Sequence, residues 1–334
     1  MPLLVVDHSE VSALLPMAEC MDAMADVLRG LAEGRAQLPL RSVMHLGGQN
    51  AFALMPAVLG SPSAIGAKVI TVFPGNRATE LDSHQGVVLL FEPGNGRLLA
   101  IMDASSITAI RTAAVSGVAT RALAREGASV LAILGSGVQA VTHLEAMVVA
   151  RPVREVRVWG RTAERARELA ATSARRFGVP VEASASPRQA VAGADIICTT
   201  TSSREPVLMG DWIAPGAHVN AVGASVPAAR ELDTNAVARS RLYVDRRESA
   251  LNEAGDFLIP RREGAFGDDH IVGEIGELLA GRIAGRRAPD EVTLFKSLGL
   301  AVEDVAAAHL IHDKAKRSGV GRWMELGGKR DAGA

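Results

Sequence analysis

Three cationic side chains are candidates for binding an anionic substrate. Lysine is scarce in this chain, with five against 31 arginines, yet Lys68 lies inside the apolar segment 65–73. Burying a lysine costs free energy unless it is paired, and the alternative is a solvated position on an edge strand. Arg111 lies among the small and apolar residues of 105–119. Its guanidinium, joined by Arg41, is suited to clamp the carboxylate of a small amino or imino acid.

A glycine-rich turn follows the apolar segment 129–134 and precedes a helical pattern. It reads Gly135, Ser136, Gly137, Val138, Gln139, Ala140, a GxGxxA sequence. In a strand–turn–helix setting such glycines permit a tight turn and a close approach of pyrophosphate to the helix N-terminus. The sequence therefore predicts a dinucleotide site, and the alternative is a glycine turn in an unrelated α/β domain.

The end of the next candidate strand bears on the choice of dinucleotide. NAD-binding proteins usually place Asp or Glu there, to bind the ribose 2′-hydroxyl. This chain has Arg161 and Thr162 instead, after Trp159-Gly160. Arg161 is suited to a 2′-phosphate and Thr162 to donating a hydrogen bond, which predicts NADP(H) and leaves NAD(H) possible. The alternative is that Arg161 is an ordinary surface residue.

Two later strands end in residues that would reach the nicotinamide half of the cofactor. Thr200 follows one of them, and Val222 and Gly223 follow the other. Ligands of doubly wound sheets lie over the carboxyl ends of the strands, so we expect these residues to contact the cofactor. A threonine that merely ends its own strand is the competing interpretation.

The remaining polar candidates leave their roles open. His84 and Gln85 lie in a polar loop beside the substrate-side strands, and Asp256 follows a short helical segment. Neither the eight histidines nor Cys20 and Cys198 show metal-ligand spacing, so no metal site is expected.

The elements that position these residues fall into two patterns. Up to the helix expected at 104–125, hairpins around 47–50 and 92–96 predict a mostly antiparallel sheet. From 129 to 245, short apolar strands alternate with helical segments, which predicts a doubly wound parallel sheet. We therefore expect an α/β protein with a Rossmann-type domain at 117–291. A second α+β domain is expected at 1–116, completed by 292–327, and a polar tail at 328–334.

Composition narrows the possible partners. The net charge of −1 gives no electrostatic reason to bind nucleic acid, and no apolar run is long enough for a membrane span. The first residues lack the features of a signal peptide, and two isolated cysteines support no disulfide framework. A cytoplasmic location is the resulting expectation.

Several segments in combination resemble the ornithine cyclodeaminase/mu-crystallin family, over about residues 39–319. They are SAIGAKVITVFPGN, LDSHQGVVLLF, SITAIRTAAVSGVATRALAR, LAILGSGVQA, LNEAGD and VTLFKSLGLAVED. The resemblance implies a homodimer, in which the first domain binds substrate and forms the dimer. It also implies that Arg41, Lys68 and Arg111 hold the substrate carboxylate and polarise the reacting centre. By the same resemblance, the residues from Gly135 to Gln139 hold the pyrophosphate, and Gly-Arg-Thr at 160–162 matches the NADPH-binding branch.

One departure from the cyclodeaminase pattern affects the expected reaction. Ornithine cyclodeaminases carry an aspartate after the fifth strand, and this chain has Ser225 at that position. We expect Ser225 to be one of the cofactor-binding residues. A serine is no carboxylate base, and the Gly-Ala-Ser form resembles mu-crystallin-type ketimine reductases instead. We expect NADPH-dependent reduction of a small ketimine acid such as Δ1-pyrroline-2-carboxylate or Δ1-piperideine-2-carboxylate. The alternatives are an ornithine cyclodeaminase, an amino-acid dehydrogenase, and an NADPH-binding protein with little turnover.

Overall fold

The computed structural model describes residues 2–327, and of residues 77 and 78 the backbone alone. The predicted tail at 328–334 lies outside the described residues. The chain forms two compact units, one made by the residues up to Arg111 and from Leu300 onward, the other by Thr112–Gly299. The boundary falls inside helix α3 (Ala104–Leu123).

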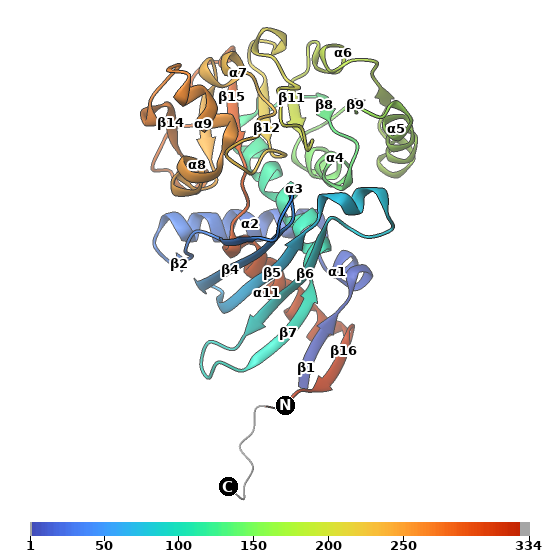
Figure 1. Cartoon of the computed structure of the whole chain (residues 1–334), viewed down its shortest axis with the longest axis vertical. Helices are drawn as coiled ribbons and strands as arrows, with labels where there is room; N and C mark the ends of the chain where they lie inside the picture. Colours follow the sequence, from blue (N-terminus) through green and yellow to red (C-terminus); the bar gives the residue numbers. More distant parts are fainter. Residues whose placement is uncertain (1, 328–334) are drawn as a thin grey trace, which may run out of the picture. The chain divides into compact units, whose positions relative to one another are not determined.

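The first unit is an eight-stranded sheet with helices (Figure 1). Besides the start of α3, its elements are β1 (Pro2–Val6), α1 (His8–Leu14), α2 (Met17–Ala32), β2 (Ala36–Gln37), β3 (Ser42–His45), β4 (Ala51–Gly60), β5 (Ser63–Val72), the 3₁₀ helix η1 (Pro74–Ala78), β6 (His84–Phe91), β7 (Leu98–Asp103), α11 (Ala301–Ser318) and β16 (Arg322–Glu325).

The strands of this sheet run in the order β16-β1-β7-β6-β5-β4-β2, with β3 also paired to β4. All pairs are antiparallel except β1 with β7, so the expectation of a mostly antiparallel sheet is confirmed. Both expected hairpins are present, as β3–β4 and β6–β7. α11 packs against β4, β5 and β6 and against α2 (Figure 1).

Strand alternation decides which side chains face α11. Along β5 the residues Ala64, Lys68 and Ile70 are buried, while the intervening positions are only half-buried. Gly66 lies on the same inward face, and a Cβ there would come within 2.8 Å of Val305 Cγ2. The missing side chain lets the first turn of α11 approach β5 closely, which places its residues beside Lys68.

The second unit is an eight-stranded sheet flanked by helices. Its elements after α3 are β8 (Val130–Leu134), α4 (Val138–Ala150), β9 (Glu155–Trp159), α5 (Ala163–Phe177), β10 (Val181–Ala183), α6 (Pro187–Val191), β11 (Ile196–Thr199), η2 (Gly210–Trp212), β12 (His218–Ala221), α7 (Thr234–Ala238), β13 (Arg241–Val244), α8 (Arg247–Glu253), α9 (Gly255–Arg262), η3 (Asp268–His270), β14 (Ile271–Glu274), α10 (Ile275–Leu279) and β15 (Thr293–Lys296).

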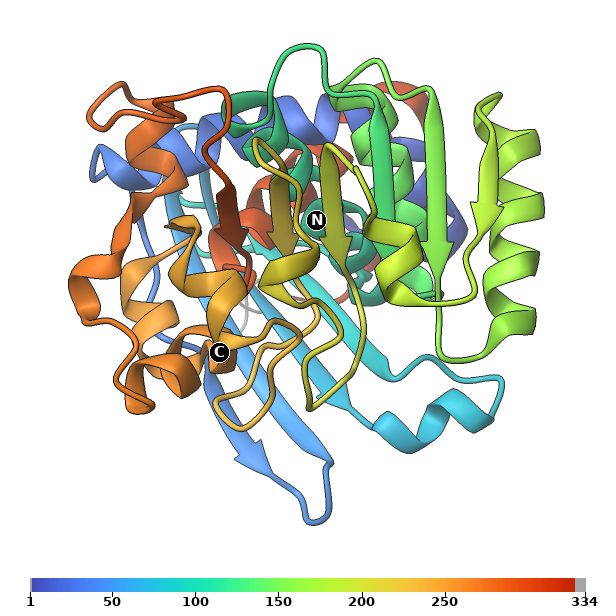
Figure 2. The same cartoon turned by 90° about the horizontal axis from the view of Figure 1, so that it is seen from above.

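The strands of this sheet are all parallel, in the order β10-β9-β8-β11-β12-β15-β13-β14. In Figure 2 the arrowheads of β8, β11 and β12 point the same way. Apolar side chains such as Leu134, Val219, Leu294 and Phe257 form one continuous core. The Rossmann-type doubly wound sheet is confirmed, and its first strand β8 is the switch point with β9 on one side and β11 on the other.

The observed boundaries differ from the expected ones at 116/117 and 291/292. Residues 112–116 and 292–299 belong to the second unit. For 292–299 the reason is β15, which pairs with β12 on one side and β13 on the other and so lies inside the parallel sheet. The helix expected at 104–125 ends at Leu123.

Candidate functional site

Lys68 is buried in the first unit, with 1% of its surface exposed. Its strand, β5, is flanked on both sides by β4 and β6, which excludes the edge-strand alternative. Lys68 Nζ lies 2.8 Å from Oδ2 and 3.0 Å from Oδ1 of Asp304, and 3.4 Å from the Thr108 hydroxyl. The lysine is therefore a paired, buried cation.

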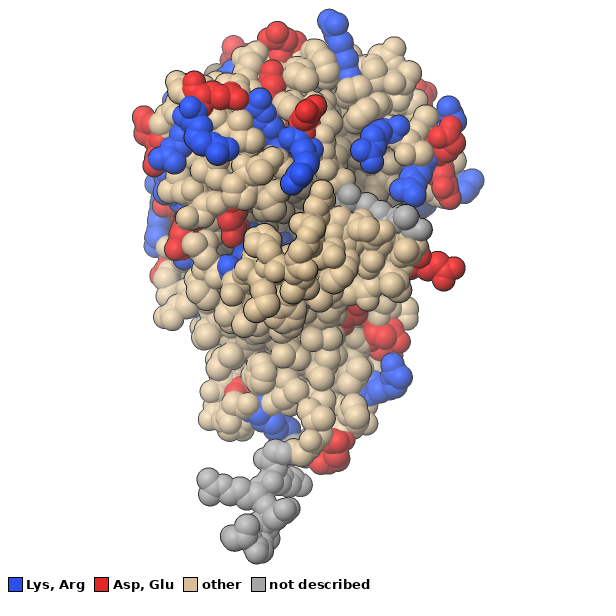
Figure 3. Space-filling model, in the orientation of Figure 1, with Lys and Arg blue, Asp and Glu red and all other residues tan. Residues whose placement is uncertain are grey.

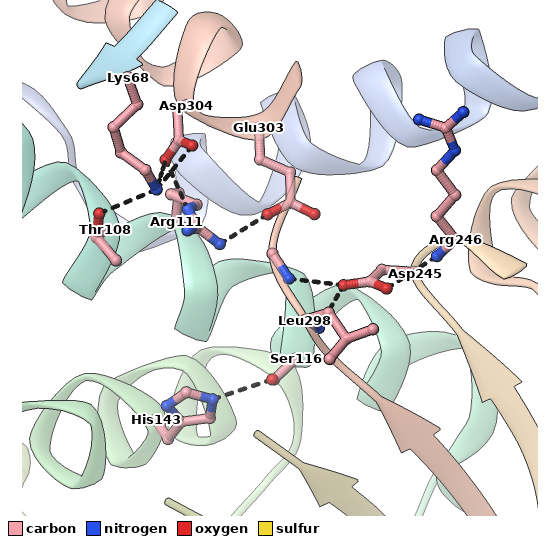
Figure 4. A network of polar contacts seen from close by, with 11 residues as sticks. Lys68, Thr108, Arg111, Ser116, His143, Asp245, Arg246, Leu298, Glu303 and Asp304 are labelled. Atoms are coloured by element: carbon pink, nitrogen blue, oxygen red, sulfur yellow. Dashed lines mark hydrogen bonds and ion pairs between the residues drawn. The ribbon is translucent and has the colours of Figure 1, made fainter. Parts of the chain in front are cut away.

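Arg111 approaches the same carboxylate from α3 (Figure 4). Its Nε donates to Asp304 Oδ1 at 2.8 Å and its Nη1 donates to Glu303 Oε2 at 2.8 Å. Both acids lie in the first turn of α11 and are fully buried. Breaking such a buried pair by removing one partner costs about 3–5 kcal/mol, so the four side chains hold one another in place.

Burial and neighbouring charges shift the protonation of this cluster. Burial, reinforced by the Arg111 charge, lowers the pKa of Lys68 to about 8, although Asp304 acts in the opposite direction. Burial raises the pKa of Asp304, but the charges of Arg111 and Lys68 outweigh it and leave that pKa below its ordinary value. Lys68 Nζ is thus a group that can gain and lose a proton near neutral pH.

Arg41 belongs to the same electrostatic environment. It is half-buried just before β3, and its charge contributes to lowering the pKa of Lys68. With Arg41, Lys68 and Arg111 protonated and two acids ionised, these five groups carry a formal charge of +1. One substrate carboxylate would neutralise that charge.

Glu303 and Asp304 were not among the residues singled out from the sequence. The available signal was a pair of acids inside the apolar run Leu298–Val305, because adjacent buried acids need cationic partners. His84, in contrast, is exposed and pairs with Val72 at the far end of β5, away from Lys68. The structure does not bring it to the cluster.

In the second unit, the glycine turn joins β8 to α4 as expected. Gly135 has φ of +136°, and a Cβ there would lie 2.4 Å from the Thr200 hydroxyl. Gly160, at the end of β9, would likewise bring a Cβ within 2.6 Å of Ser136 Oγ. Two of the glycines are thus required by close packing between the strand ends.

Gly137 has a different reason to be glycine. It is the N-cap of α4, with φ of −99° and no side chain capping the helix. A Cβ at this position would meet nothing within 4 Å. Neither strain nor packing requires glycine here, whereas a pyrophosphate approaching the backbone would. Together with Val138 and Gln139 in the first turn of α4, the turn fits a dinucleotide.

The residues expected to select the dinucleotide lie one strand away. Arg161 and Thr162 are exposed after β9, and Thr162 is the N-cap of α5 without a hydrogen bond from its side chain. The structure thus places a cation and a hydroxyl at the carboxyl end of β9.

The expected nicotinamide-side residues end two adjacent strands. Thr200 follows β11, while Val222 and Gly223 follow β12. Ser225 is exposed in the loop after them. Asp256, whose role the sequence left open, is buried and accepts hydrogen bonds from the backbone N–H groups of Glu231 and Leu232.

The sequence predicts no part in the site for metal ligands, cysteines or membrane-spanning helices. Among residues 2–327 the His, Cys, Asp and Glu side chains form no group of three that could hold a metal ion. Cys20 and Cys198 are buried, unpaired thiols. No helix in the described part of the chain combines the length and apolarity that a membrane span requires.

Comparison with known proteins agrees with this arrangement. A model of the ornithine cyclodeaminase/mu-crystallin family matches residues 3–319. The chain belongs to this family.

Within the family, the chain is 44% identical over 311 residues to the ketimine reductase mu-crystallin of Mus musculus, covering 92% of this chain and 94% of the relative. The structure of Thermococcus litoralis Δ1-pyrroline-2-carboxylate reductase in complex with NADH and L-proline matches with a TM-score of 0.94 and 37% identity, over 96% of this chain and 99% of that one. An archaeal alanine dehydrogenase dimer with bound NAD matches with a TM-score of 0.92 and 31% identity, over 98% and 100%.

Proposed function

We propose that this member of the family reduces a small cyclic ketimine acid, such as Δ1-pyrroline-2-carboxylate or Δ1-piperideine-2-carboxylate, with NADPH. The hydride adds to the imine carbon and a proton to the nitrogen, giving the cyclic amino acid. The proposal rests above all on the buried Lys68–Asp304–Arg111 cluster, a cationic site with a titratable ammonium. The similarity to two reductases of carbon–nitrogen double bonds supports it.

Five charged residues of the first unit have three tasks in this reaction. Arg111 and Arg41 hold the substrate carboxylate, and Glu303 and Asp304 fix the Arg111 guanidinium in one orientation. Lys68 Nζ exchanges a proton with the imine nitrogen, directly or through water. A protonated imine carbon is electrophilic already, so orientation supplies most of the rate enhancement.

The dinucleotide is held by residues of the second unit. Gly135, Ser136, Gly137, Val138 and Gln139 bind its pyrophosphate, and the nicotinamide supplies the hydride when bound. Thr200, Val222, Gly223 and Ser225 contact the nicotinamide half. Arg161, with Thr162, pairs with the 2′-phosphate, which makes NADPH the preferred cofactor and NADH a poorer one.

A second candidate reaction is favoured by one observation. The archaeal alanine dehydrogenase matches almost the whole chain, so oxidation of a linear amino acid is the alternative on this scaffold. Ornithine cyclodeamination is less well supported, because exposed Ser225 stands where the cyclodeaminase pattern has an aspartate. An NADPH-binding protein with little turnover is the remaining alternative.

The decisive experiment follows NADPH oxidation at 340 nm with both cyclic ketimine acids, and with NADH in parallel. Turnover that favours NADPH is the expected result. L-Alanine with NAD(P)⁺, and ammonia release from L-ornithine with NAD⁺, test the two alternative reactions. Tight NADPH binding without turnover on any of these substrates would replace the reductase by a binding role.

We further propose that the protein is a homodimer formed through the outer face of the first unit's sheet. β4 alternates buried residues with exposed apolar ones, and the exposed set of β3 and β4 comprises Val43, Met44, Phe52, Leu54 and Val58. In Figure 3 few charged side chains cover this part of the surface. Such an apolar patch is typical of a subunit interface, and the archaeal alanine dehydrogenase was solved as a dimer.

The proposal includes a cytoplasmic location. Its support is the pair of buried, unpaired thiols, which persist in a reducing compartment. Fractionation of cells followed by detection of the protein tests it.

A further inference from the structure

Glu231 is a fully buried acid in the second unit, and its carboxylate joins two strand ends. Oε1 accepts hydrogen bonds from the backbone N–H of Thr201 at 2.6 Å and from its hydroxyl at 2.7 Å. Oε2 accepts from the hydroxyl of Thr199 at 2.8 Å and from the backbone N–H of Gly223 at 2.6 Å. Four donors converge on one carboxylate, and they come from the carboxyl ends of β11 and β12.

A second buried acid, Asp256, and a buried lysine, Lys296, hold the backbone around Glu231 in place. Asp256 Oδ1 accepts from the backbone N–H of Glu231 at 2.7 Å, and its Oδ2 lies 3.0 Å from Lys296 Nζ. Lys296, on β15, also donates to the carbonyl of Ala221, the last residue of β12, at 3.2 Å. The backbone carbonyl of Glu231 in turn accepts from the N–H groups of Val207 and Leu208.

Gly223 packs closely against this carboxylate. A Cβ on Gly223 would lie 2.6 Å from Glu231 Oε1 and 1.9 Å from the Thr201 carbonyl. Burial raises the pKa of Glu231, and Asp256 adds to that effect, while Lys296 and Thr201 act against it. All four hydrogen bonds run toward the carboxylate, and two of the donors are backbone N–H groups that can only donate.

We propose that Glu231 is a positioning residue, which sets the two strand ends that contact the nicotinamide half of the dinucleotide. Thr200 lies between Thr199 and Thr201, both bound by Glu231, and Val222 immediately precedes Gly223. The inference rests on the proposed function, because it assumes that a nicotinamide dinucleotide binds over these strand ends. Glu231 itself is buried and acts through the backbone rather than by touching the cofactor.

The substitution Glu231→Gln tests this with almost unchanged volume. A glutamine amide accepts through one oxygen, and its other end carries two N–H donors. The threonine hydroxyls can rotate to accept from them, but the N–H of Thr201 or of Gly223 then faces an N–H group. Thr201 would lose its carboxylate acceptor, and Gly223 would keep only its longer contact of 3.3 Å with the Thr199 carbonyl. The affected strand end must shift to restore a hydrogen bond.

The experiment measures binding of NADPH by its fluorescence, and of 2′-phospho-ADP-ribose, which lacks the nicotinamide, by calorimetry. For Glu231→Gln we expect the Kd of NADPH to rise roughly tenfold or more, with the Kd of 2′-phospho-ADP-ribose unchanged within about twofold. Thr199→Val, which removes one of the four donors, should shift the NADPH Kd in the same direction by less. Glu168→Gln, on the exposed face of α5, is the matched control and should change neither constant.

Each outcome has a defined meaning. An equal loss of affinity for both ligands would show a general structural role and overturn the positioning role. Unchanged affinity for both ligands would also overturn the positioning role. Binding is measured without an imino acid, so failure to reduce ketimines leaves this test intact. A wild-type protein that binds neither NADPH nor NADH would overturn the proposed function and this inference together.

Discussion

At Lys68 the fold lowers the pKa of a buried ammonium group. The lysine shares Asp304 with Arg111, so a single carboxylate serves two cations, and burial removes the water that would otherwise stabilise the charge. The result is a pKa of about 8, between the ordinary value for a lysine and the pH of a cell. Such a group can both give and take a proton at modest cost.

This protonation predicts how the reaction responds to pH. Lys68 Nζ is protonated below a pKa of about 8 and neutral above it, so kcat/KM for ketimine reduction should fall as the pH rises through this value. The side chain of Lys68→Arg stays protonated throughout, so its kcat/KM should be lower but should no longer fall near pH 8. For Lys68→Met, kcat/KM should fall roughly 100-fold or more.

The matched control for Lys68 is Lys316→Met, at an exposed position on α11, which should keep the wild-type profile. If kcat/KM of Lys68→Arg still falls near pH 8, the titrating group is another residue and the assigned role of Lys68 is wrong.

Arg161 carries the proposed preference for NADPH. Charge-assisted hydrogen bonds to a 2′-phosphate would be lost in Arg161→Ala, so KM for NADPH should rise roughly 10- to 100-fold and KM for NADH should stay nearly constant. Arg175→Ala, at the exposed C-terminal end of α5, controls for the loss of one positive charge. Parallel losses with both cofactors would contradict a contact to the 2′-phosphate.

At the scale of elements, the glycine turn between β8 and α4 contains two glycines with separate physical causes. Gly135→Ala adds a Cβ against Thr200 at a φ of +136°, so the thermal midpoint should fall. Gly137→Ala puts its Cβ into open space, so the midpoint should change little while the Kd for NADPH rises by roughly tenfold or more.

Thermal unfolding and cofactor binding measured on the two glycine variants separate these effects. Equal loss of stability in both variants would mean that Gly137 is required by the fold and not by the ligand.

The elements that could be predicted from the sequence are those whose pattern lies within a short stretch of the chain. The hairpins, the glycine turn and the helix from Ala104 follow from patterns within about 20 residues of one another. The four residues of β15 are all buried, and nothing in their local sequence says which sheet they join. The partner of Lys68 is equally remote, because Asp304 lies 236 positions away along the chain. Local pattern therefore indicated that Lys68 needs a partner but not which residue supplies it.

At the scale of the whole molecule, the exposed apolar face of β3 and β4 predicts the oligomeric state. Phe52→Glu combined with Leu54→Glu puts two charges on that face, so the protein should elute and scatter light as a monomer, whereas we expect a dimer for the wild type. Val149→Glu, at an exposed apolar position on α4, should stay dimeric. A wild type that is monomeric at micromolar concentration would overturn the proposed interface.

Both units depend on segments that follow residue 292. β15, at 293–296, fills an interior place in the parallel sheet, and α11, at 301–318, covers the inner face of the other sheet and carries two of its buried acids. During synthesis these segments leave the ribosome after every other strand of both sheets except β16. Neither core can close until then, because long-range pairings must wait for their partners. A nascent chain stopped before residue 293 therefore exposes two incomplete sheets at once, which favours its aggregation.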